Sequence, residues 1–249
     1  MSDTQKPPLN VVVLNGCSIF RQLQLEEALL RVDTSNWCLL NTAVEPAIVM
    51  GISGKVEELI NLPKIQKHPI PIIRRFSGGG TVYVDAQTYF VSFIVQNRLL
   101  KTPSYPSHIH EWAKQFYSKV FLWEEFNLLE NDYVLGKHKF GGNAQYICKN
   151  RILHHTSLLW DYDAEAMDYL LIPKKAPQYR SKRNHADFLC RLSERISTLS
   201  ALEEMLKNAL AQQYKLQEAT LDILLEIEKR THRQSTCYVD VSSSQSLSI

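Results

Sequence analysis

Short runs of β-branched and aromatic residues, bounded by glycine, proline or asparagine, recur along the chain and predict strands. They lie at 11–14, 37–40, 47–50, 81–84, 89–95, 133–135, 146–147 and 152–153. Apolar residues spaced three or four apart predict amphipathic helices over 19–32, 109–123, 164–171, 202–214 and 221–230, and a short helix over 54–60 that ends before Pro63. Because strands come in succession with helices interspersed, we predict an α+β fold, with a mixed, mainly antiparallel sheet flanked by helices.

The length of 249 residues suits one large domain with a small appendage. We expect a catalytic domain over 1–200, a helical extension over 201–241 and a flexible serine-rich tail over 242–249. A basic stretch lies over 174–185, and its segment 180–183 is interpreted as a solvated loop or as a lid that faces an anion.

Composition excludes several classes of protein. With 45% hydrophobic and 22% charged residues the chain is neither collagen-like nor an acidic disordered protein. A net charge of +2 gives no general attraction to nucleic acid, and no apolar run approaches the ~20 residues that cross a bilayer, so neither partner is expected. The five cysteines lack C-x-x-C spacing and the N-terminus lacks a signal-peptide pattern, which predicts a cytoplasmic protein without disulfides.

Three consecutive glycines, Gly78, Gly79 and Gly80, follow Arg74 and Arg75. A glycine run cannot pack a core, so either the backbone there needs a positive φ or another group approaches it closely. The free N–H groups of such a loop can bind an anion, and guanidinium groups suit phosphate or carboxylate. A flexible hairpin turn beside two surface arginines is the alternative interpretation.

Lys139 precedes a second glycine pair, Gly141–Gly142, by two residues. A lysine beside a backbone-exposing segment is a suitable point charge for a phosphoryl oxygen. The alternative is that Lys137 and Lys139 are ordinary surface lysines of a strand.

His154 and His155 are adjacent in a predicted strand. Neighbouring strand residues point to opposite faces, so the two imidazoles cannot easily ligate one metal ion, and we expect at least one to be structural. His108 and His110 lie where a helix is predicted to begin, which argues against a metal site there.

Together these segments resemble the lipoate–protein ligases of the biotin/lipoate ligase superfamily. Residues 74–85 read RRFSGGGTVYVD and resemble the RRxSGGGxVxxD motif of that family. Residues 139–145, KFGGNAQ, resemble its K-x-x-G-x-A segment, and residues 154–159, HHTSLL, resemble its HHGTLL segment. The order and spacing of the motifs also agree, and the similarity extends over 25–199.

The resemblance implies the α+β catalytic-domain fold of that family and an enzyme that activates lipoate with ATP and Mg²⁺ to lipoyl-AMP. The lipoyl group then passes to a lysine of a carrier domain, in an E2 subunit of a 2-oxoacid dehydrogenase or in the glycine cleavage H protein. Lys139 matches the essential lysine, and Asp85 would help to hold the adenylate, with metal binding as one option. The other implied binding residues are Arg74, Arg75, Ser77, Gly78, Gly79, Gly80, Val82, Gly142, Asn143, Ala144, His154 and His155.

The chain departs from this pattern at several positions. Many members continue with His-Asp-x-Gly-Asn after the glycine loop, where this chain keeps only Asp85, and Thr156 and Ser157 replace Gly and Thr of the third motif. The residues after 199 are too few for the separate C-terminal domain that many members carry. We therefore expect either a separate accessory chain or an enzyme that uses preformed lipoyl-AMP.

Two other functions remain open on the same fold. An octanoyl- or lipoyltransferase would need a cysteine shortly before the lysine segment, but residues 126–139 contain none, and Cys148 lies after it with only Lys149 beside it as a basic neighbour. A non-catalytic ligand-binding module is the second alternative. Biotin–protein ligase is a more distant relative, because its GRGR-type loop is absent here.

Overall fold

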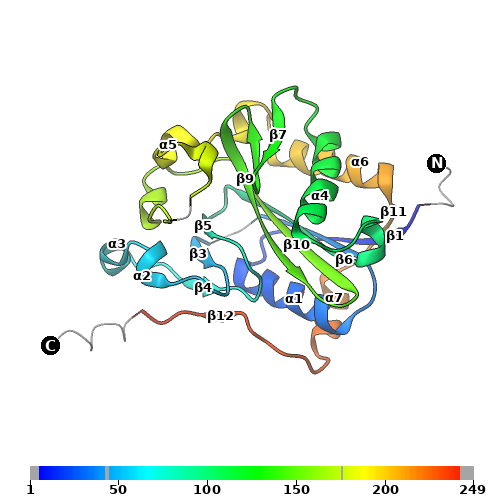
Figure 1. The fold of residues 1–249 in the computed structure, drawn as a ribbon. Coiled ribbons are helices and arrows are strands. Elements are labelled where there is room, and N and C mark those ends of the chain that lie inside the picture. Colours follow the sequence, from blue (N-terminus) through cyan, green and yellow to red (C-terminus); the bar gives the residue numbers. More distant parts are fainter. Residues whose placement is uncertain (1–5, 43–44, 175, 242–249) are drawn as a thin grey trace.

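The computed structural model describes residues 6–42, 45–174 and 176–241, and within them the strands form two sheets (Figure 1). The tail predicted over 242–249 lies outside these residues. The larger sheet has eight strands in the order β11-β1-β2-β6-β10-β9-β8-β7. Their bounds are β1 Pro8–Val13, β2 Trp37–Thr42, β6 Thr88–Gln96, β7 Phe126–Leu129, β8 Asp132–Leu135, β9 His138–Ile147, β10 Arg151–Leu159 and β11 Lys215–Glu218.

Strand β1 runs parallel to β2 and β11, and every other pairing in the larger sheet is antiparallel. The smaller sheet has the order β12-β4-β3-β5, with only the β3–β4 pair parallel. Its strands are β3 Ala47–Met50, β4 Ile72–Arg74, β5 Thr81–Val84 and β12 Cys237–Tyr238. The predicted mixed, mainly antiparallel α+β fold is confirmed, although its strands are divided between two sheets.

Helices cover both faces of the larger sheet (Figure 1). On one face α4 (Pro106–Val120) packs on α6 (Leu199–Gln213), and on the other α1 (Ile19–Val32) packs on α7 (Leu221–Glu228). Alternate residues of β6 serve the two cores: Val91 and Phe93 face α4 and α6, whereas Ile94 faces α1. Because both faces are buried, β6 is apolar almost throughout rather than alternating.

Local sequence explains where several helices begin. Ser18 accepts a hydrogen bond from the backbone N–H of Arg21 and caps α1, whose bounds match the prediction. The short helix predicted over 54–60 is α2 (Val56–Leu59), which ends before Pro63 as predicted. Pro63 itself lies in the first turn of the next helix, α3 (Leu62–Lys67), which Asn61 caps. The helix predicted over 164–171 is only a 3₁₀ turn, Ala166–Tyr169.

The C-terminal stretch is built into the same cores. Leu202, Leu206 and Leu210 of α6 join the core around α4, while β11 extends the larger sheet beside β1. Leu224 and Ile227 of α7 join the core beneath α1. The domain boundary at 200 stays a prediction.

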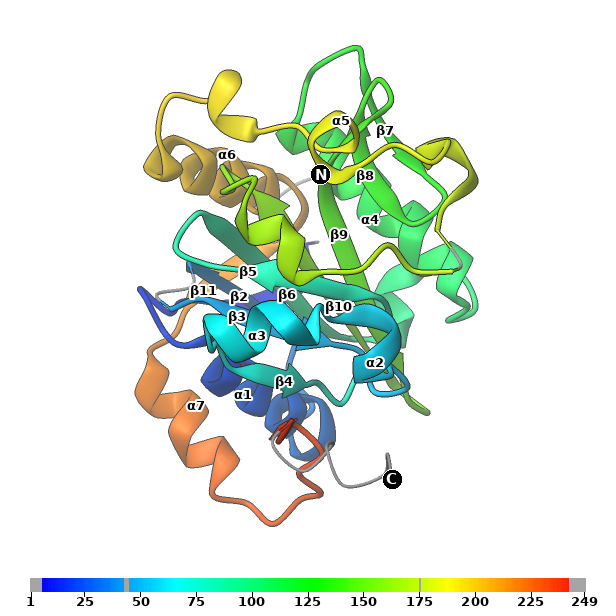
Figure 2. The same cartoon turned by 90° about the vertical axis from the view of Figure 1, so that its left-hand side faces the viewer.

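Figure 2 shows how the segment after β10 returns to the sheets. It passes beside β5, loops outward and comes back to α5 (His185–Phe188), next to β8. Residues 170–189 of this segment, of which residue 175 lies outside the described residues, are called the strap below.

Candidate active site

A cavity of about 700 Å³ lies between the two sheets and the strap. Its walls come from the loop after β4, from β5, β6, β9 and β10, and from the strap. This volume is in the range of small-molecule sites in proteins. Of the residues predicted for the site, Lys139, Arg75, Gly78, Gly79, Gly80, Val82, Gly142, Asn143, Ala144 and His155 line it.

The glycine loop is held against β9. Gly79 has φ +104°, and a Cβ added there would lie 2.7 Å from the guanidinium group of Arg75 and 3.2 Å from the carbonyl oxygen of Asn143. The N–H of Gly78 donates to the carbonyl oxygen of Gln145 at 3.3 Å. Both expectations for the glycine run, a positive φ and a close approach, are therefore confirmed at Gly79.

Arg75 supports this loop from behind. Its guanidinium group donates to the carbonyl oxygens of Gly78 and Gly80, each at 2.9 Å, and only 4% of the residue is exposed. Burial lowers the pKa of Arg75 to about 10, so the group stays charged at neutral pH. Arg74 instead donates to the carbonyl oxygen of Gly54 at 2.7 Å, outside the cavity lining.

Gly51, a residue that the sequence analysis did not select, packs against the outside of the loop. A Cβ there would lie 2.3 Å from the carbonyl oxygen of Gly79, so only glycine fits. A single glycine directly after strand β3 was the signal in the sequence. Ser77 is fully buried beside the loop and does not line the cavity.

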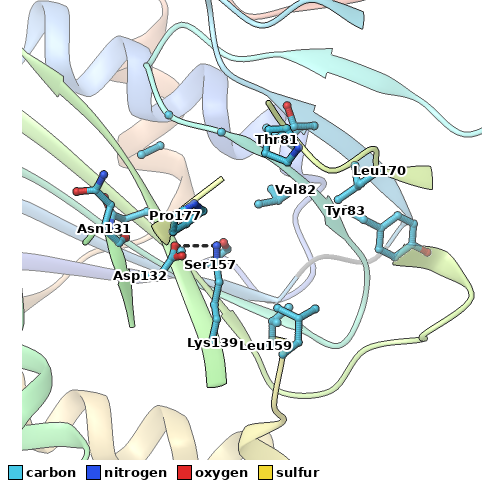
Figure 3. A pocket seen from close by; sticks show the side chains of 18 of the residues that line it. Thr81, Val82, Tyr83, Asn131, Asp132, Lys139, Ser157, Leu159, Leu170 and Pro177 are labelled. Carbon is cyan, nitrogen blue, oxygen red and sulfur yellow. Dashed lines mark hydrogen bonds and ion pairs between the residues drawn. The ribbon is translucent and has the colours of Figure 1, made fainter. Parts of the chain in front are cut away.

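Lys139 and Asp132 face each other across the β8–β9 hairpin (Figure 3). The Lys139 ammonium lies 2.7 Å from Oδ1 of Asp132. A Cβ added at Gly142 would lie 3.3 Å from the Lys139 Nζ atom, so the missing side chain leaves room for the amine. Sequence reasoning missed Asp132, although a tight hairpin at Gly136 predicts that residues before and after it lie side by side.

The second carboxylate oxygen of Asp132 accepts a hydrogen bond from the strap. The Tyr179 hydroxyl donates to Oδ2 at 2.9 Å, and the backbone N–H of Tyr179 donates to Glu130 at 3.1 Å. Burial and the Asp132 carboxylate raise the pKa of Tyr179, so its hydroxyl stays protonated and donates. Lys139, Asp132 and Tyr179 therefore form one chain of polar contacts.

The two histidines of β10 point to opposite faces, as predicted. His154 is fully buried in the core, where it bonds the Tyr133 hydroxyl at 2.8 Å, and it does not line the cavity. Burial lowers its pKa to about 3, so His154 is neutral at physiological pH.

His155 faces the cavity and is backed by a buried carboxylate. Its Nδ1 atom lies 2.8 Å from Oε1 of Glu26, which also accepts from the Ser92 hydroxyl at 2.6 Å and from the Gln22 amide at 2.8 Å. The carboxylate fixes the orientation of the imidazole ring. Glu26 is fully buried in α1 and was not selected from the sequence.

Asn143, which follows Gly141–Gly142 in β9, makes two side-chain hydrogen bonds that hold this part of the strand. Its amide nitrogen donates to the carbonyl oxygen of Asn131 at 2.6 Å, and its Oδ1 lies 2.9 Å from Nε2 of His110. His110 comes from α4 and lines the cavity, a placement that sequence reasoning did not foresee.

Asp85 lies outside the lining, in the turn between β5 and β6. Its Oδ1 accepts from the backbone N–H of Gln87 at 2.9 Å, and burial raises its pKa. No group of three His, Cys, Asp or Glu side chains able to hold a metal ion occurs in the described part of the chain. Glu130 and Asp132 are the carboxylates that the cavity offers.

The five cysteines are all free, as predicted. Cys148 lies at the turn between β9 and β10 and donates to the carbonyl oxygen of Arg151 at 3.3 Å. Among the described lining residues none is a cysteine. Within residues 6–42, 45–174 and 176–241, no helix is long and apolar enough to cross a bilayer.

Comparison with known proteins gives a consistent picture. Residues 18–215 match the family described as the lipoyl protein ligase A/B catalytic domain. The chain is 32% identical over 231 residues to a Plasmodium falciparum protein named inactive lipoate–protein ligase 2, covering 69% of this chain and 60% of that protein. It is 31% identical over 156 residues to the lipoate–protein ligase LplJ of Bacillus subtilis, covering 60% of this chain and 44% of that one. The chain thus spans about half the length of these relatives.

Solved structures share the fold. A lipoate–protein ligase A bound with ATP superposes with a TM-score of 0.73 at 15% identity, over 91% of this chain and 95% of that chain. The bi-partite lipoate protein ligase of Thermoplasma acidophilum superposes with a TM-score of 0.72 at 16% identity, over 90% and 93% of the two chains.

Proposed function

Because the chain belongs to the lipoyl protein ligase A/B catalytic-domain family, we propose that it is an ATP-dependent lipoate–protein ligase. It activates lipoate to lipoyl-AMP and transfers the lipoyl group to a lysine of a carrier domain, in an E2 subunit or in the glycine cleavage H protein. The cytoplasmic location stays a prediction.

One observation carries this proposal: the amine of Lys139 and the backbone of the glycine loop face the same cavity. Attack of the lipoate carboxylate on the α-phosphate releases pyrophosphate and builds negative charge on the phosphoryl oxygens. Attack of the acceptor amine on the lipoyl carbonyl then builds charge on the carbonyl oxygen and releases AMP. A fixed ammonium and backbone N–H groups stabilise both charges, and the protein supplies no nucleophile.

Apolar residues in another part of the cavity wall suit an acyl chain. Val82, Phe90 and Ile19 provide apolar wall, and His155 lies two residues beyond Ser157 on the same face of β10. Ser157 pairs with Gly142, beside the Lys139 amine, so the imidazole lies about 7 Å further along the sheet. An acyl chain with its carboxyl group at Lys139 would lie along this apolar wall.

The residues present also fit Mg²⁺ that arrives with ATP. Mg²⁺ bound to a nucleotide keeps several waters and needs only one or two protein carboxylates, of which Glu130 in the cavity wall would supply one. The ion would offset phosphate charge when bound. Asp85, which the resemblance suggested for this role, lies outside the cavity lining.

The transferase alternative finds no support in the lining, since Cys148 donates to a backbone carbonyl at a hairpin turn. A non-catalytic role is the second candidate, because the Plasmodium relative at 32% identity is named inactive. Lys139, the glycine loop and the cavity between them favour catalysis. An accessory chain remains part of the proposal, supported by the Thermoplasma neighbour that is described as bi-partite.

The test is a complete reaction with ATP, Mg²⁺, lipoate and a lipoyl carrier domain. AMP release together with a lipoyl mass increase on the carrier lysine is expected. Pyrophosphate release without carrier modification would indicate that a second chain is required for transfer. Binding of lipoate and ATP without pyrophosphate or AMP release would favour the non-catalytic candidate.

A further inference from the structure

Arg180 of the strap is a buried cation that the function described so far does not use. It ends the 3₁₀ turn Gln178–Arg180, lines the cavity and is only 5% exposed. Its Nε atom donates to the carbonyl oxygen of Arg183 at 2.9 Å, and its guanidinium group lies 4.7 Å from the centre of the Phe188 ring. Its Nη2 atom is buried and has no hydrogen-bond partner within the described residues.

A buried guanidinium donor without an acceptor is costly, because burial removes the water that would otherwise satisfy it. The carboxylate next to it does not fill the gap. Both oxygens of Asp132 are already engaged, one by Lys139 and the other by Tyr179. The Nη2 atom of Arg180 therefore lacks an acceptor, and Arg180 is one of the residues that line the cavity.

The strap is held so that Arg180 keeps a defined position relative to Lys139. The backbone N–H of Cys190 donates to the carbonyl oxygen of Lys139 at 2.9 Å, and the Arg183 guanidinium donates to that of Lys137 at 2.9 Å. Tyr179, directly before Arg180, is bound to Asp132. These contacts tie the strap to β9, the strand that carries Lys139, and to the residue before it.

We infer that Arg180, which the strap carries, is a second cationic ligand for an oxyanion in this cavity. The inference rests on the proposed function for the identity of the anion, which is a phosphate group of the nucleotide or the carboxylate of the acyl substrate. A guanidinium group suits either one, since its planar fork matches their geometry.

The experiment measures binding rather than turnover. Calorimetric affinities for ATP, inorganic pyrophosphate and lipoate are compared between the wild type, Arg180→Gln, Arg180→Lys and Lys182→Gln. Lys182 is the matched control, because it is an exposed cation on the same strap and lies outside the lining. Arg180→Lys keeps the charge without the fork, and thermal unfolding checks that each variant folds.

Arg180→Gln is expected to weaken one class of probe by about 10- to 100-fold, as for loss of a charge-assisted hydrogen bond. Arg180→Lys should lie between it and the wild type, and Lys182→Gln should bind normally. Weaker ATP and pyrophosphate binding identifies the phosphate as the partner, and weaker lipoate binding identifies the carboxylate. Unchanged affinities in a folded Arg180→Gln protein overturn the inference alone. A wild type that binds none of the three probes overturns it together with the proposed function.

Discussion

The position of the Lys139 ammonium depends on two neighbouring residues, Gly142 and Asp132. The ammonium lies beside Gly142, where any side chain would crowd it, and 2.7 Å from Asp132, which holds it towards the cavity. Without that carboxylate a four-carbon lysine stem would sample many rotamers. The absence of a side chain at Gly142 therefore matters to the site as much as the Asp132 carboxylate does.

Lys139→Ala is expected to lower the rate of AMP release by about 10²–10³, because it removes the cation that stabilises the developing charge. The measurement is AMP release with ATP, Mg²⁺, lipoate and carrier. Lys137→Ala is the control, since Lys137 is an exposed lysine of the same hairpin that does not line the cavity. Near-normal turnover by a folded Lys139→Ala protein would remove Lys139 from the mechanism.

Gly79→Ala is expected to abolish ligand binding, because the new methyl group meets both Arg75 and the Asn143 carbonyl while the backbone has φ +104°. Gly136→Ala is the control for the backbone strain of an alanine at positive φ, because Gly136 lies outside the cavity lining. Gly136 also has a positive φ, +59°, but no atom lies within 4 Å of its added Cβ. Gly136→Ala should lose about 1–2 kcal/mol of stability through backbone strain alone, and Gly79→Ala should lose more because of its added contacts. Only Gly79→Ala should also lose ATP and lipoate affinity by calorimetry. Equal binding by the two would contradict this account.

At the scale of elements, β10 shows how one strand serves two purposes. His154 and Thr156 are buried on the face towards α4, while His155, Ser157 and Leu159 face the cavity. The period of two in a strand makes this division unavoidable once the register with β6 and β9 is set.

His154 should make the protein less stable at acidic pH. Its folded-state pKa is about 3 against an ordinary 6.5, so the unfolded chain binds a proton below pH 6.5 that the folded protein does not. This contribution to stability is complete above pH 6.5 and is lost as pH falls towards 3, by about 1.4 kcal/mol per unit.

Urea unfolding of the wild type and His154→Gln between pH 7 and 4.5 measures this loss. The glutamine keeps an acceptor for the Tyr133 hydroxyl but does not titrate. The stability difference between the two proteins should shrink as pH falls. A difference that is constant with pH would show that His154 is not the titrating group.

At the scale of the whole molecule, the C-terminal stretch closes the structure by returning to α1. Glu27, whose side chain is 2% exposed, pairs with Arg31 at 2.8 Å and accepts from the backbone N–H groups of Ser235 and Thr236 at 2.9 and 3.1 Å. The neighbouring Glu26 reaches into the opposite side and holds His155. Helix α1 therefore joins the cavity to the C-terminal segment.

Glu27→Gln is expected to cost about 1.5–3 kcal/mol, because a buried charged acceptor of several hydrogen bonds is lost. Limited trypsin digestion should then cleave faster at the exposed Arg233, while lipoate affinity stays normal. Glu218→Gln, at an exposed position of β11, is the control. Unchanged cleavage would mean that Glu27 does not anchor the segment.

The sequence predicted most elements and much of the cavity lining, for identifiable reasons. Gly78–Gly80 carry a local signal, since a glycine run has few structural uses, and Lys139 was selected because it precedes a second glycine run. Glu26 carries no such signal, because an isolated acid in a helix is ordinary in any sequence.

The sequence by itself determined the periodic patterns of its helices and strands, the residues that cap its helices and the family that its motifs resemble. These features depend on residues close together in the sequence. Only the tertiary structure decided which side of the loop Arg74 and Arg75 face, which histidine is buried and which carboxylate meets the lysine. The physical reason is that sheet register and the packing of α1 and the strap bring together residues far apart in the chain, up to the 129 positions between Glu26 and His155, and no local pattern encodes those contacts.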